Sequence, residues 1–187
     1  LNVSISGTAL SAATSVACTN GQFAHNFTAA SGDGTKQISV SQTDVAGNVG
    51  SDQRTIQVDA TAPRIAITAP AANSSSVNGV TLIGSCENGL NIVVAGAGLS
   101  ATVNGSCSNS AFNIPVLFSN GDGANLVTVT QTDGAGNSGS DSRSFIKDSA
   151  APNISITGPV ANTEAQNGVR IVGTCENGLA GNITGGV

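Results

Sequence analysis

Residues 129–137 read Val-Thr-Gln-Thr-Asp-Gly-Ala-Gly-Asn, and residues 40–48, 89 positions earlier, read Val-Ser-Gln-Thr-Asp-Val-Ala-Gly-Asn. Both copies begin with β-branched and polar residues and run into an Asp-x-Ala-Gly-Asn segment. Alternation with a period of two is typical of a strand with one buried face, and Asp, Gly and Asn favour turns. The stretch therefore predicts a β-strand that ends in a turn, and this unit occurs twice.

The similarity extends along the whole chain of 187 residues. When residues 1–98 are aligned without a gap to residues 90–187, 42 of the 98 positions are identical. Self-similarity at a fixed period is the mark of a repeat architecture. We therefore expect a tandem array with a period of 89 residues, which is a normal size for a small β-sandwich.

The composition suits strands joined by polar turns. The chain has 24 Gly, no Trp, Tyr or Met, 3% aromatic residues and 9% charged residues. Asn, Ser and Thr together make up about a third of the residues. No window keeps apolar residues at the helical spacing i, i+3, i+4, i+7. We expect an acidic, compact, all-β protein.

Several classes of protein are excluded by charge and hydropathy. The net charge is −5, and the six Lys and Arg are scattered, whereas nucleic-acid binding needs clustered basic residues. No apolar run approaches the roughly 18 residues of a spanning helix. No signal-peptide pattern is visible, so we expect either a mature chain or an internal piece.

Two Asp-x-x-Ala-Pro segments, Asp59–Pro63 and Asp148–Pro152, predict the module boundaries. Proline fixes its own φ and makes the preceding residue extended, so these segments should be short, stiff links. On this division, residues 62–150 form a complete module. Residues 1–61 form a module that lacks its first strands, and residues 151–187 supply only the first strands of a further module. We expect the ends to be completed head to tail by the chain itself, through strand completion between copies or through one continuous polypeptide.

Alternation and turn residues predict seven strands in the complete module. They are expected near 64–69, 79–86, 90–95, 101–107, 111–117, 125–132 and 140–147. The segment Asn73–Ser76 is expected to be one of the turns between them. Seven short strands at this spacing favour an antiparallel, immunoglobulin-like (Ig-like) β-sandwich. The alternative, a β-solenoid, needs a shorter period and a repeated hydrophobic ladder, which the sequence does not show.

The complete module resembles the bacterial Ig-like tandem repeat domains of large surface adhesins and fibres. The residues that carry the resemblance are Ala62–Thr68 (APRIAIT), Gly79–Ser85 (GVTLIGS), Ala111–Ile114 (AFNI), the Asp133–Asn137 turn and the closing Asp148-x-x-Ala-Pro. In such proteins these modules act as spacers outside the cell. The resemblance implies a structural stalk or fibre at the cell surface, although the cysteines depart from the usual pattern.

The four cysteines form two pairs related by the repeat, Cys18 with Cys107 and Cys86 with Cys175. Within the complete module, Cys86 and Cys107 are predicted to end two strands and to form a disulfide. Zinc binding is the alternative, but the chain has no CxxC motif and only one His, so it lacks the ligands of a tetrahedral zinc site. A disulfide would indicate an extracellular setting. Cys18 and Cys175 are expected to pair with each other between successive units.

Asp44, Asp133, Asp59 and Asp148 are candidate calcium ligands. The first two lie in Asp-x-Ala-Gly-Asn turns and the last two at the predicted links. Calcium often stiffens the junctions of Ig-like arrays, so the resemblance implies this role. Calcium needs six to eight oxygen ligands, and the acidic density is low. The alternative is that these carboxylates accept hydrogen bonds from the backbone of their own turns.

No catalytic residues are predicted. His25 has Ile114 as its counterpart and is expected to be an ordinary strand residue. A pair of carboxylates could serve glycoside hydrolysis, but there is no aromatic platform for a sugar. We expect no enzyme and no cofactor other than calcium. The alternative to a structural spacer is an Ig-like module that binds a carbohydrate or another surface.

Overall fold

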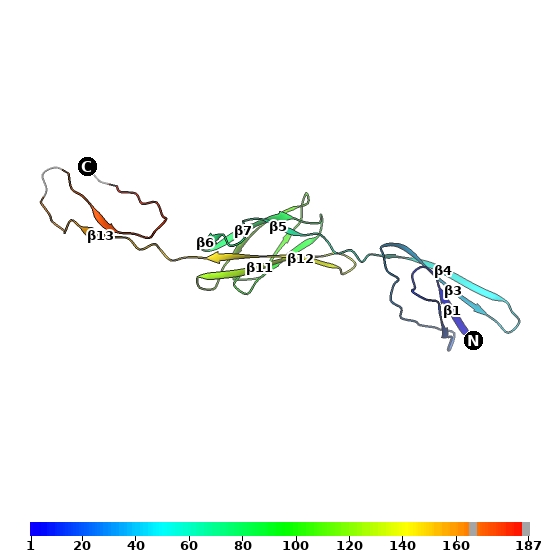
Figure 1. Cartoon of the computed structure of the whole chain (residues 1–187). Coiled ribbons are helices and arrows are strands. Elements are labelled where there is room, and N and C mark those ends of the chain that lie inside the picture. The colour runs from blue at the N-terminus through cyan, green and yellow to red at the C-terminus, as the bar shows by residue number, and fades with distance from the viewer. Residues whose placement is uncertain (165–167, 185–187) are drawn as a thin grey trace.

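The computed structural model describes residues 1–164 and 168–184. Within those ranges the regular secondary structure consists of strands, and no helix is long and apolar enough to cross a membrane. Figure 1 shows three bodies in a row, joined by single stretches of chain. We name them the first unit (residues 1–58), the middle unit (63–147) and the last unit (152–184). The predicted third module also includes residues 165–167 and 185–187, which lie outside the described residues.

The middle unit contains eight strands in two sheets. The three-stranded sheet has the order β10-β7-β5, and the five-stranded sheet has the order β6-β12-β11-β8-β9. All pairs are antiparallel except that of β6 with β12. The strands are β5 (Ala66–Ala69), β6 (Ser75–Ser76), β7 (Gly79–Ser85), β8 (Asn91–Ala95), β9 (Val103–Ser106), β10 (Ala111–Leu117), β11 (Gly123–Thr132) and β12 (Ser138–Lys147).

The two sheets pack face to face because each strand has one apolar side. In β10, Phe112, Ile114 and Val116 are buried, while the residues between them are exposed. This is the period of two that a strand with one buried face requires. A single core cluster joins residues of both sheets, among them Leu82 of β7, Val129 of β11 and Phe145 of β12, all fully buried.

All seven predicted strands are present, with bounds that differ from the prediction by at most two residues. The structure adds β6, which we predicted to be part of the Asn73–Ser76 turn. Asn73 does have the positive φ of a turn residue, but the next residues pair with Ile146 and Lys147 of β12. A pair of residues is too short for periodicity to reveal it.

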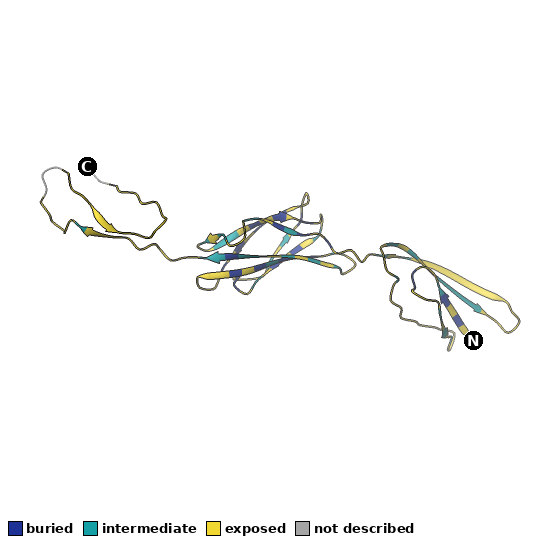
Figure 2. Ribbon diagram, in the orientation of Figure 1, coloured by how far each residue is buried: buried dark blue, intermediate teal, exposed yellow. Residues whose placement is uncertain are grey.

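The first unit is one four-stranded sheet with the order β2-β1-β3-β4. Its strands are β1 (Asn2–Ser6), β2 (Thr14–Ala17), β3 (Gly34–Thr43) and β4 (Val49–Val58), and each begins 89 residues before its counterpart, β8, β9, β11 or β12. Its buried core contains only Val3, Ile5, Ala9 and Leu10. Figure 2 shows β4 almost entirely exposed, unlike β12 in the middle unit.

The last unit is a pair of short strands, β13 (Ser155–Gly158) and β14 (Val172–Thr174). They pair with each other as β5 pairs with β7. None of the residues whose burial is described from 152 to 184 is buried. The same type of strand pair is therefore covered by a second sheet in the middle unit and uncovered here.

Leu82→Ala should lower the free energy of unfolding of the middle unit by about 2–5 kcal/mol, because it leaves a cavity in a closed core. Its counterpart Ile171 is half exposed, so Ile171→Ala should change stability by less than about 0.5 kcal/mol. Urea unfolding followed by circular dichroism measures both. Equal losses in the two variants would contradict the difference in burial.

Candidate functional sites at the module junctions

The link between the first and middle units, residues 59–62, is held from both sides. From the first unit, the Asp33 carboxylate accepts hydrogen bonds from the Ala60 N–H (2.7 Å) and from the Thr61 hydroxyl. From the middle unit, the Asn137 amide donates to the backbone carbonyl of Asp59 at 3.1 Å. These contacts fix the direction in which the chain leaves one unit and enters the next.

A glycine lets the end of this link lie against the middle unit. A Cβ on Gly139 of β12 would lie 1.9 Å from the Pro63 carbonyl oxygen. Real Cβ atoms do not approach so closely, so only glycine permits this contact at the present spacing. The segment that leads into β5 therefore packs directly on the backbone of β12.

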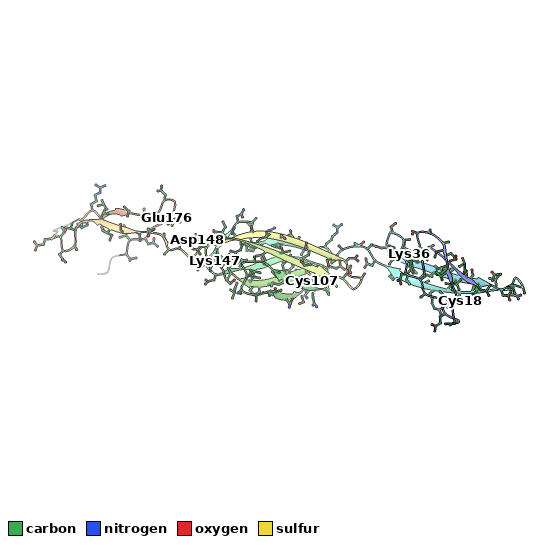
Figure 3. All side chains as sticks on the ribbon, turned by 90° about the horizontal axis from the view of Figure 1, so that it is seen from below. Cys18, Lys36, Cys107, Lys147, Asp148 and Glu176 are labelled. Carbon is green, nitrogen blue, oxygen red and sulfur yellow. A yellow bond between two sulfur atoms is a disulfide. The ribbon has the colours of Figure 1, made fainter. Side chains whose placement is uncertain are left out.

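The link between the middle and last units is held by the middle unit in the same way, through the Asp122 carboxylate. The Ser149 N–H and hydroxyl both donate to Asp122 Oδ1, at 3.0 Å and 2.7 Å. Side-chain hydrogen bonds from Thr61 and Ser149, respectively, are the main cause that holds the pKa of Asp33 and of Asp122 below the ordinary value of 3.8. Figure 3 shows Asp148 at this link, beside Lys147 at the end of β12.

Asp33 and Asp122 were not among the predicted site residues. They lie in Gly-Asp-Gly turns, and the sequence offers no local sign that these turns contact a link. A signal was present, because all eight Asp residues recur at the 89-residue offset. That signal does not distinguish a turn residue from one that holds a junction.

The carboxylates of Asp44 and Asp133 cap their own turns. Asp133 Oδ1 accepts from the Ala135 and Asn137 N–H groups, and Oδ2 accepts from the Asn137 amide, all at 2.9 Å. Asp44 makes the equivalent three bonds at the same distance. The side-chain bond from Asn137 or Asn48 is the first cause that lowers the pKa of each carboxyl.

The four predicted calcium ligands do not form one site. Asp44 and Asp59 flank β4, and Asp133 and Asp148 flank β12; each strand has ten residues, or roughly 33 Å of extended chain. Only Asp59 and the Asp133 turn meet at a junction. In residues 1–164 and 168–184 no three His, Cys, Asp or Glu side chains are grouped to hold a metal.

The donor set at that junction fits calcium poorly. Asp133 already uses both carboxylate oxygens on its own turn, and Asp59 Oδ1 accepts from the Thr61 N–H at 3.1 Å. Asp148 Oδ1 makes the corresponding bond with the Ala150 N–H at 3.2 Å. Calcium needs six to eight oxygens, so the observed bonds favour turn capping, and calcium stays a prediction from the resemblance.

Cys86 and Cys107 form a disulfide with Cα atoms 5.9 Å apart. Cys86 follows β7 of the three-stranded sheet, and Cys107 follows β9 of the five-stranded sheet, so the bond joins the two layers. Both residues belong to the buried core cluster. Two backbone hydrogen bonds join the same segments beside the disulfide. The Cys86 N–H donates to the Ser110 carbonyl, and the Gly89 N–H donates to the Cys107 carbonyl.

Cys18 and Cys175 are free thiols in the first and last units. Figure 3 shows Cys18 in the first unit and Glu176, the neighbour of Cys175, in the last unit, on opposite sides of the middle unit. Their predicted pairing would therefore have to join two different copies or repeats, and it stays a prediction.

The expectation that His25 is a strand residue is wrong. Its counterpart Ile114 lies in β10, which pairs along its whole length with β7. In the first unit no described residue takes the place of β7, and residues 23–28 form no strand. His25 is consequently exposed and outside the sheet.

No family model matches the chain, and no curated protein sequence is similar to it. Among solved structures, the chain is similar to the "Crystal structure of tetra-tandem repeat in extending region of large adhesion protein". The TM-score is 0.42 and the sequence identity 19%, over 86% of this chain and 45% of that one. The match thus spans less than half the length of that chain.

Replacing both Cys86 and Cys107 by Ser should lower the stability of the middle unit by roughly 3 kcal/mol, because the unfolded chain regains the freedom that the bridge removed. Unfolding of the protein in urea, with and without reductant, measures this. Reductant should destabilise the wild type and leave the double variant unchanged. Identical midpoints for the oxidised wild type and the variant would contradict the prediction.

The Asp133 carboxylate should make the stability of the middle unit depend on pH. Hydrogen bonds lower the pKa of Asp133 in the folded state below 3.8. The ionised carboxylate therefore stabilises the folded state at pH values above the pKa of the unfolded chain, and this stabilisation disappears as the pH falls through the lowered pKa. Melting temperatures between pH 2 and pH 6 should therefore fall less steeply with acid in Asp133→Asn than in the wild type. An unchanged slope would contradict this.

Proposed function

We propose that the chain is a structural repeat section of an extracellular fibre or adhesin stalk, built from Ig-like β-sandwich modules with a period of 89 residues. The observation that carries the proposal is the doubly held first link. Asp33 anchors the link to the module before it, and Asn137 anchors it to the module after it. A link held on both sides transmits orientation from one module to the next, which a spacer needs.

Two further features support the proposal. The disulfide in the middle unit favours an oxidising environment outside the cell. The middle unit closes its core with fully buried apolar side chains from both sheets. We propose a mechanical role for this unit, without catalysis.

Stiffness of the first link tests the proposal. Small-angle X-ray scattering of dilute, monomeric protein should give the maximum dimension of an extended rod. Asn137→Ala should lower the radius of gyration, because it removes the hydrogen bond to the Asp59 carbonyl. Asn48→Ala is the matched control: it removes the same turn bond in the first unit but touches no link within the monomer.

A wild type that scatters as a freely jointed chain would contradict the role as a stiff spacer. So would equal effects of the two Asn variants, because the link bond would then make no difference to the orientation of the units.

A further inference from the structure

The chain contains two lysines, Lys36 and Lys147, and their ammonium groups bind equivalent turns. Lys36 Nζ donates to the Ser31 carbonyl at 2.7 Å, and Lys147 Nζ donates to the Asn120 carbonyl. Ser31 and Asn120 are counterparts at the 89-residue offset, and each directly precedes a Gly-Asp-Gly turn. Figure 3 shows each lysine at the end of its unit from which the next link begins.

The two lysines themselves are not counterparts. Lys36 lies in β3, and the residue at its place in the middle unit is Asn125. Lys147 lies in β12, and the residue at its place in the first unit is Val58. The same contact is therefore made from two different strands, whereas a contact simply copied with the repeat would come from the same position in both units.

Both strand positions lie next to the turn. Gly123 ends one turn and pairs with Lys147, and Gly34 ends the other turn and pairs with Val58. A lysine at this place in β12 or β4 thus lies directly opposite the end of the turn. Lys36 follows Gly34 by two residues, so both lie on the same face of β3. Either strand can bring an ammonium group to the turn.

The Gly-Asp-Gly turns need such a contact because their own backbone does not close them. The Asp133 turn, in contrast, is closed by a hydrogen bond from the Gly136 N–H to the Asp133 carbonyl at 3.2 Å. The described structure has no backbone hydrogen bond between residues 31 and 34 or between residues 120 and 123. Residues 31–33 and 120–122 are also exposed, so burial does not hold these turns either.

The ammonium also lies near the carboxylate that holds the link. A Cβ on Gly32 would lie 4.0 Å from Lys36 Nζ, so the charge lies over the turn that contains Asp33. The hydrogen bonds from Thr61 and Ala60 lower the pKa of Asp33 most, and the charge of Lys36 lowers it further. An ammonium has three N–H donors and a full charge, so one lysine can fix a carbonyl and stabilise a nearby carboxylate.

The second junction has the same arrangement. The hydrogen bonds from Ser149 lower the pKa of Asp122 most, and the charge of Lys147 adds to them. Lys147 is also the last residue of β12, immediately before the link. Each link thus begins beside a lysine, an exposed turn and the carboxylate of that turn.

Resting on the proposed function, we propose that Lys36 and Lys147 are positioning residues for the two links. Each ammonium fixes its Gly-Asp-Gly turn, so that the carboxylate of the turn holds the following link in one direction. The chain itself supplies the positive charge at each junction, from either of two strands. The first junction consequently keeps its direction without a bound metal ion.

The distance between the first and middle units tests this. Spin labels on Ser51→Cys and Ser140→Cys, at exposed counterpart positions in β4 and β12, report it in full-length protein. Cys18→Ser and Cys175→Ser remove the free thiols, and the Cys86–Cys107 disulfide stays oxidised. Pulsed electron paramagnetic resonance should give one narrow distance distribution in EGTA, and millimolar calcium should leave it unchanged.

Lys36→Met removes the ammonium and keeps a long side chain. In the labelled protein it should broaden the distance distribution about twofold, because the link then samples directions that the turn no longer restricts. Lys36→Met/Val58→Lys places the ammonium where the middle unit has it and should restore the narrow distribution. Lys36→Met/Thr55→Lys is the matched control: it carries the same charge on the opposite face of β4 and should stay broad.

A distribution as narrow in Lys36→Met as in the parent protein would overturn the role of the lysine and leave the proposed function intact. Equal distributions in the two relocated-lysine variants would also overturn it, because the placement of the charge would then make no difference. A parent protein that becomes narrow only with calcium would assign the charge at the junction to the metal. A parent distribution that is broad in both conditions would contradict the lysine's role and the stiff spacer together.

Discussion

The pairing of β7 with β10 decides whether a module of this protein closes its core. In the middle unit this pairing places Leu82 against the facing sheet and orders β10, so Phe112 and Ile114 turn inward. In the first unit, where this pairing is absent, the corresponding residues 22–28 form no strand, and Phe23, the counterpart of Phe112, is exposed. The buried area that stabilises a sandwich is therefore available only when residues 63–90 and 91–147 meet.

The junction before the middle unit depends on how β5 lies on β12. β5 enters the sandwich over Gly139 and is held by Asp141 and Arg143 of β12. The link before it can then be fixed by the Asn137 amide. β12 therefore contacts both the core, through Phe145, and the segment that follows the link, through Gly139.

The strands and the Cys86–Cys107 pair could be predicted from the sequence. The strands show local alternation, and the two cysteines lie at the ends of strands predicted in this way. Alternation with a period of two predicts β10 and β11 without reference to the rest of the chain. The failures are non-local. His25 lies outside any strand because no described residue of the first unit takes the place of β7, and the roles of Asp33 and Asp122 depend on hydrogen bonds to links 27 or 28 residues further along the chain. The two residues of β6 are too few to form a pattern.

Native-state hydrogen exchange on monomeric Cys175→Ser protein tests the dependence on β7 most directly. The account predicts that amides of β7, β10, β11 and β12 exchange slowly through one cooperative opening. Amides of residues 22–28 should exchange at least about a hundredfold faster than those of β10, their counterparts, because no strand covers them. Equal protection of residues 22–28 and 111–117 in the monomer would contradict the account.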